Sequence, residues 1–111
     1  MTGDRKAAVR AYKEQRRPMG IYRVRCTANG SYLVGSSVDL PSMLNRQRSQ
    51  FEMGSHPDHG MQRHYNEFGV SAFAFEVLDE LEPPDDPAHD ARADLAALLE
   101  MWRERLGHSD S

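Results

Sequence analysis

The sequence predicts a small α+β domain in which helices lie against a sheet of three strands. Two observations predict the sheet. Segments in which apolar and polar residues alternate flank an Asn-Gly pair near residue 30, and another such segment spans 71–81. An apolar stripe at helical spacing over 91–106 predicts a helix that flanks this sheet. With 111 residues, the chain suits one domain with one core.

The first expected element is an extra N-terminal helix over residues 4–16, which lack strand signals and are followed by Pro18. Residues 1–19 carry six Lys or Arg residues against two acidic ones. Such asymmetry predicts either a basic arm for phosphate backbones or a solvent-exposed helix face. The candidate phosphate contacts of this arm are Arg10, Lys13, Arg16 and Arg17.

The next expected element is a hairpin around Asn29-Gly30. This pair predicts a two-residue type I′ turn, in which both central residues have φ > 0. Such a turn would place Val24 opposite Gly35. Because neighbouring strand side chains point to opposite faces, one position of slip decides which residues share a face.

Two helices are expected between the hairpin and the third strand. The first starts near Pro41 and runs to about Met53, and the second spans 58–68. An acidic, proline-rich loop follows the strand over 71–81. The last helix has the clearest apolar stripe, which consists of Leu95, Leu98, Leu99, Trp102 and Leu106.

The composition argues against several classes of protein. No apolar run approaches the roughly 20 residues of a membrane span, and the N-terminus lacks the apolar stretch of a secretory signal. The single Cys26 cannot form an internal disulfide, which fits a reducing cytoplasm. The net charge of -3 does not mark a nucleic-acid binder.

Several motifs in order resemble those of the GIY-YIG nuclease family. "GIY" stands at 20–22, and Gly35 follows Gly20 by fifteen residues in "LVGSSVDL". "GSHPDHGMQRHYNEFG", "FAFEVL" and "LLEMWRERL" are similar to later family segments. The resemblance covers about residues 20–106, and leaves 1–19 as a basic segment and 107–111 as a tail.

The resemblance implies a three-stranded antiparallel sheet and hydrolysis of DNA phosphodiesters with a divalent cation, Mg²⁺ or Mn²⁺. In the family, a tyrosine helps to activate water, an arginine stabilises the phosphate, and a glutamate on the last helix holds the cation. A phosphodiester is an anion that repels a nucleophile, so cation and guanidinium must neutralise it.

Only part of the family's set of site residues is present. Tyr22 matches the first tyrosine and is the strongest catalytic candidate. The second tyrosine position, two before the motif glycine, is Leu33, whereas Tyr32 is expected on the reverse side of the strand. Met43 stands at the arginine position, but Arg46 lies three residues later on the same helix face and is long enough to reach back.

The remaining candidates also depart from the family. Gln47 stands where a histidine is common, and Leu99 stands at the glutamate position, with Glu100 beside it as the candidate metal ligand. His56 fits the Gly-x-His segment as a phosphate contact. Arg63 is a further candidate for polar contacts.

Three functions therefore stay open. The first is a divergent endonuclease that uses Tyr22, Arg46 and Glu100 with a divalent metal. The second is a catalytically silent module of the same fold that binds nucleic acid or a protein partner. The third is a protein-interaction domain, which the acidic overall charge favours. The partners that these functions imply are DNA, another protein or a second copy of the chain.

Overall fold

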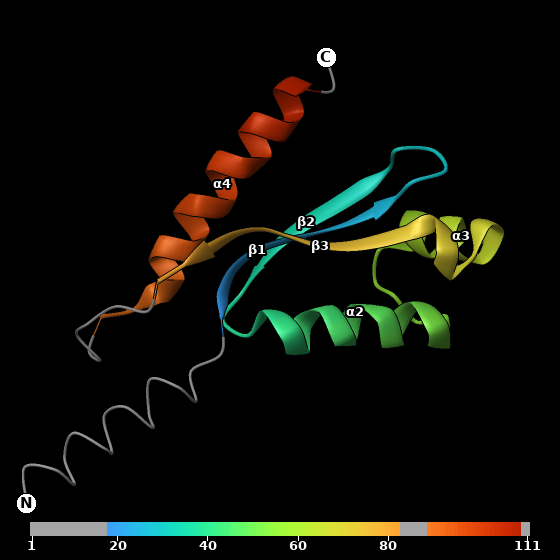
Figure 1. Cartoon of the computed structure of the whole chain (residues 1–111), viewed down its shortest axis with the longest axis horizontal. Coiled ribbons are helices and arrows are strands. Elements are labelled where there is room, and N and C mark those ends of the chain that lie inside the picture. Colours follow the sequence, from blue (N-terminus) through green and yellow to red (C-terminus); the bar gives the residue numbers. More distant parts are fainter. Residues whose placement is uncertain (1–17, 83–88, 110–111) are drawn as a thin grey trace, which may run out of the picture.

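A computed structural model describes residues 18–82 and 89–109 of the chain (Figure 1). The elements follow in the order β1 (Met19–Cys26), β2 (Tyr32–Ser37), α2 (Leu40–Met53), α3 (His59–Phe68), a short 3₁₀ helix (Val70–Ala72), β3 (Phe73–Leu81) and α4 (Ala91–Ser109). This order confirms an α+β fold. The predicted helix over 4–16 lies outside the described residues, and so do the candidate phosphate contacts Arg10, Lys13, Arg16 and Arg17.

The three strands form an antiparallel sheet in the order β2-β1-β3, so β1 pairs on both sides. Tyr22 lies opposite Gly35 on β2 and opposite Val77 on β3. The register of β1 against β3 shifts between Ile21 and Tyr22. Such an irregularity bends a strand and increases its local twist.

The turn of the hairpin is longer than the sequence predicts. Cys26 donates its backbone N–H to Ser31, and Gly30 donates to Cys26, which leaves four residues in the loop. Gly30 has φ of 79°, whereas no described residue other than glycine has positive φ. The type I′ prediction is therefore wrong, because Asn29 would need positive φ as well.

The longer loop moves the pairing by two residues, so that Val24 lies opposite Leu33 and not opposite Gly35. A shift of two residues leaves each side chain on its predicted face. Leu33 and Gly35 therefore share the face of Tyr22, and Tyr32 lies on the reverse side, as alternation predicts.

Local sequence explains where the helices α2 and α3 begin. Asp39 caps α2 by accepting from the backbone N–H of Ser42, and Pro41 occupies the first turn. Asp58 caps α3 by accepting from the backbone N–H of Met61. Aspartate at such positions satisfies N–H groups that have no partner within the helix.

One hydrophobic cluster joins the sheet to α2 and α3. Its buried members are Tyr22, Val24, Cys26, Leu40, Phe51, Met61 and Phe73. Ile21 and Leu95 are buried outside this cluster, and Trp102 of α4 donates to Asp79, which pairs with Ile21. The sheet therefore has α2 and α3 on one side and α4 on the other, and Figure 1 shows the strands running between α2 and α4.

Within residues 18–82 and 89–109, no helix is both long and apolar enough to cross a membrane.

A substitution at Gly35 tests whether the Tyr22 ring packs directly on this residue. A Cβ atom at position 35 would lie 2.6 Å from the Tyr22 hydroxyl oxygen and 2.7 Å from its Cζ atom. We expect Gly35→Ala to lower the free energy of unfolding by about 1–3 kcal/mol, because the buried ring must move. Urea denaturation measures this change.

Gly60→Ala is the matched control, because its Cβ would meet nothing closer than 3.5 Å and position 60 is helical. Its stability should stay the same or rise by up to about 1 kcal/mol. Equal stability of the Gly35→Ala variant and the unaltered chain would contradict the close approach.

Candidate functional site

Tyr22 lies at the centre of the sheet, and its ring covers Gly35 on the side of α2. The side chain is buried, with 7% of its surface exposed. Burial raises the pKa of the Tyr22 hydroxyl, although the nearby charge of Arg46 acts in the opposite direction. Near neutral pH the group is therefore a phenol, which can donate or accept a hydrogen bond but is not a phenolate base.

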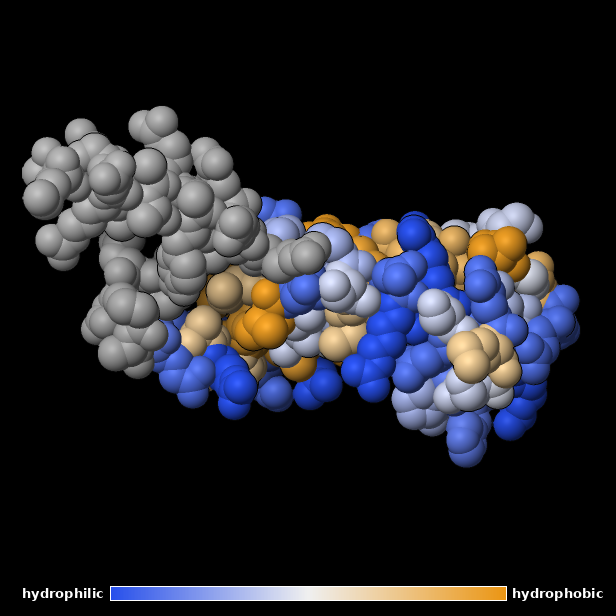
Figure 2. Space-filling view, turned by 90° about the horizontal axis from the view of Figure 1, so that it is seen from below, coloured by the Kyte–Doolittle hydropathy of each residue, from blue (hydrophilic) through white to orange (hydrophobic). Residues whose placement is uncertain are grey.

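Arg46 is exposed on α2, and its charge acts on the Tyr22 hydroxyl. The charge of Arg46 acts on Tyr22 although the two residues are 24 positions apart in the sequence, but no hydrogen bond joins their side chains among the described residues. Among the described residues, Arg46 makes no ion pair. We call this pair the Tyr22–Arg46 surface. Figure 2, seen from the α2 side, shows hydrophilic residues crossing the middle of that face.

Apolar side chains border the Tyr22–Arg46 surface. Leu33 and Met43 are partly buried and pack against the cluster that contains Tyr22. They occupy the two positions at which the sequence comparison expects a second tyrosine and an arginine. The two positions at which a tyrosine and an arginine were expected are therefore apolar.

His56 is held inside a network between α2 and α3. Its Nε2 lies 2.5 Å from Oε1 of buried Gln47, and its Nδ1 accepts from the backbone N–H of Asp58 at 3.0 Å. Its ring stacks on Phe51 with a centroid distance of 4.0 Å. Gln62 joins the network by accepting from the backbone N–H of His56.

These contacts fix the protonation of His56. Because the Gln47 oxygen can only accept, the proton lies on Nε2 and the ring is neutral. Burial lowers the pKa of His56, and the charge of Asp58 only partly opposes this effect. The predicted contact with phosphate would require the Gln47–His56 bond to open, since both ring nitrogens are engaged.

Arg63 lies on a shallow hollow of about 350 Å³ at the start of α3. His56 and Asn66 also line this hollow. Arg63 is exposed, so its guanidinium can reach an anion without losing a buried contact. Arg63 thus places a positive charge beside the His56 network, but Tyr22 does not line this hollow.

Two solved structures resemble this arrangement. One is an alanine variant of the catalytic domain of the intron endonuclease I-TevI, with a TM-score of 0.66, 26% identity, and coverage of 81% of this chain and 84% of that chain. The other is the catalytic domain of the homing endonuclease I-TevI, with a TM-score of 0.64, 26% identity, and coverage of 80% and 88%. The resemblance to the GIY-YIG nucleases is confirmed. No family model and no curated protein matches the sequence.

Within the GIY-YIG fold, Tyr22 and Arg46 stay the predicted catalytic residues, whereas the contact made by Gln47 was not predicted. A glutamine at a position where the family commonly has histidine suggests only a lost group. The structure shows that Gln47 instead binds His56, nine positions later. No periodicity signals this contact, because the two residues belong to a helix and to the loop after it.

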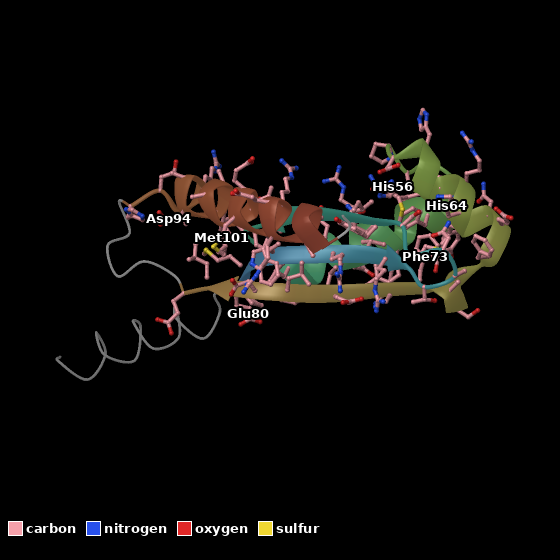
Figure 3. All side chains as sticks on the ribbon, turned by 90° about the horizontal axis from the view of Figure 1, so that it is seen from above. His56, His64, Phe73, Glu80, Asp94 and Met101 are labelled. Carbon is pink, nitrogen blue, oxygen red and sulfur yellow. The ribbon has the colours of Figure 1, made fainter. Side chains whose placement is uncertain are left out.

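The expected metal ligand lies apart from this network. Figure 3 places Met101, the residue after Glu100, toward the end of the molecule that carries Asp94 and away from His56. The Glu100 side chain is 78% exposed and its carboxylate lies 4.0 Å from Arg103. GIY-YIG nucleases use a divalent metal. The described residues contain no group of three or more His, Cys, Asp or Glu side chains that could hold such an ion, so any such ion would be held by fewer of them, such as Glu100 alone.

The neutral state of His56 predicts a loss of stability in acid. Between the lowered pKa of folded His56 and the usual value of about 6.5, the unfolded chain binds more protons than the folded chain. The stability that His56 contributes is therefore complete above about pH 6.5 and falls as the pH drops through this range. The midpoint of urea denaturation, measured at several pH values between pH 7 and pH 5, checks how steeply the stability falls with pH.

His56→Gln should be less stable and should depend less on pH in this range, because the titrating group is absent. His59→Gln is the control, since His59 is exposed and should keep the slope of the unaltered chain. An unchanged slope in His56→Gln would show that other groups cause the acid sensitivity.

Proposed function

We propose that this protein binds the phosphate backbone of DNA at the Tyr22–Arg46 surface. The observation that supports the proposal is that the Tyr22 ring packs against α2, on which Arg46 is exposed to solvent with its charge acting on the Tyr22 hydroxyl. The likeness to the catalytic domain of an endonuclease supports DNA as the ligand.

The chemistry of these two groups suits a phosphodiester. A guanidinium can donate two parallel hydrogen bonds to phosphate oxygens, and its charge offsets that of the phosphate. A protonated Tyr22 can donate a further bond to the same group. Arg63 and the basic residues Arg10, Lys13, Arg16 and Arg17 are proposed as additional phosphate contacts, and a protein partner or second copy could add more.

A second candidate function is hydrolysis of the bound DNA strand. Tyr22 at the first motif position and the likeness to a nuclease domain favour it. Hydrolysis needs a base for the attacking water, and the raised pKa of Tyr22 leaves little phenolate near neutral pH. It also needs a cation, Mg²⁺ or Mn²⁺ in this family, and Glu100 is the proposed ligand. Binding without efficient cleavage is therefore the function that the residues support best.

Removing the Arg46 charge should weaken binding to duplex DNA regardless of its sequence. We expect Arg46→Gln to reduce affinity and to lower the slope of log affinity against log salt by about one unit. Arg46→Lys, which keeps the charge, should retain most of the slope. Fluorescence anisotropy with a labelled duplex at several salt concentrations measures both quantities.

Arg92→Gln is the control, because Arg92 is exposed on α4, away from the Tyr22–Arg46 surface. It should bind as the unaltered chain does. Equal losses in the Arg46 and Arg92 variants would indicate a general charge effect and would contradict the proposed surface.

A plasmid assay separates binding from cleavage. Supercoiled plasmid incubated with Mg²⁺ or Mn²⁺ near pH 7 should stay intact while the protein binds it. Nicking that Tyr22→Phe abolishes and Arg92→Gln preserves would instead establish the second candidate, because only the hydroxyl differs in Tyr22→Phe.

A further inference from the structure

The side of the sheet opposite to Tyr22 carries charged residues that the proposed DNA contact does not use. Side chains alternate along β1, so Arg23 and Arg25 point away from the core that Tyr22 and Val24 face. Figures 1 and 3 show that α4 stops short of the β1–β2 turn along the long axis of the molecule. The half of this side nearer the turn therefore extends beyond the end of α4.

Two cations share one anion on this side. Nη2 of Arg23 lies 2.7 Å from Oε2 of Glu76, and Nε of Arg25 lies 2.9 Å from Oε1. The hydrogen bond from Arg23, with help from Arg25, keeps the pKa of Glu76 below its ordinary value, so it stays a carboxylate. The three side chains together carry one net positive charge.

The two arginines have donors left over. Glu76 engages only Nε of Arg25, and this side chain is 42% exposed, which leaves its two terminal nitrogens for another acceptor. The buried Nε of Arg23 has no hydrogen-bond partner among the described residues. Two guanidinium groups together have more N–H donors than one carboxylate can accept from, so Glu76 alone cannot satisfy both arginines.

An aromatic residue stands opposite Arg25 in the sheet. Arg25 is opposite Tyr32 on β2 and opposite the small Ala74 on β3. Side chains opposite each other on paired strands are close neighbours. Tyr32 is half-buried, so the row Ala74, Arg25, Tyr32 places an arginine and a partly exposed aromatic residue at neighbouring positions of this side.

We infer that this arginine face, made of Arg23, Arg25 and Tyr32, binds single-stranded nucleic acid. An aromatic residue and a guanidinium on neighbouring strands suit the stacking of an unpaired base, while the net positive charge attracts the phosphate. A duplex hides its base faces and would gain only the charge. The inference does not depend on the Tyr22–Arg46 surface, because the sheet lies between the two.

Anisotropy titrations with labelled oligothymidylate, oligouridylate and a duplex test the arginine face. The unaltered chain should bind both single strands in low salt. Tyr32→Ser should weaken single-strand binding by about tenfold, because stacking is lost, and Tyr32→Phe should restore it. Arg25→Gln should weaken single-strand binding too, whereas Arg92→Gln should not.

The same titrations separate this inference from the proposed function. Arg46→Gln should lower duplex affinity more than single-strand affinity, whereas Tyr32→Ser should lower single-strand affinity more than duplex affinity. Thermal melting followed by circular dichroism confirms that each variant is folded. No binding of either single strand by the unaltered chain, or equal binding by folded Tyr32→Ser and Tyr32→Phe, would overturn the inference.

Discussion

The contact between the Tyr22 ring and Gly35 sets the geometry on which the rest of the site depends. The ring occupies the place where any larger residue would put its Cβ atom. Burial of the ring raises the pKa of the Tyr22 hydroxyl, and the charge of Arg46 lowers this pKa by a smaller amount. The close packing therefore determines both the position of the phenol and its chemical state.

The central strand gives the molecule two chemically different sides. Tyr22, Val24 and Cys26 belong to the hydrophobic cluster with α2 and α3. Arg23 and Arg25 lie on the other side, where Glu76 binds both. Because β1 pairs with a neighbour at each edge, neither set can exchange sides without loss of the whole register. The alternation of one strand thus separates the Tyr22–Arg46 surface from the arginine face.

Much of the fold could be predicted from the sequence because its signals are local. The periodicity of the strands and helices, Pro41 and the motif glycines are visible in short windows, and they predict the observed order of elements. The hairpin loop was mispredicted because a longer loop with Gly30 alone at positive φ competes with the type I′ turn. The face of Tyr32 was nevertheless correct, since a shift of two residues preserves alternation.

The site was less predictable because it depends on contacts between distant residues. Spacing within one helix predicts that Arg46 reaches the position of Met43, and this stays a prediction. The bond between Gln47 and His56, in contrast, joins a helix to the following loop, and no spacing rule encodes it. The shared use of Glu76 by two arginines likewise depends on the pairing of β1 with β3.

The most direct test of the central claim is an NMR titration of the ¹⁵N-labelled protein with a short DNA duplex. The arginine Nε–Hε signals report each guanidinium separately. If duplex binds at the Tyr22–Arg46 surface, the Arg46 signal and the backbone amide signals around Tyr22 and Gly35 shift together as duplex is added, while the Arg92 signal does not move. A titration in which duplex binds but the Arg46 signal stays in place would contradict the account.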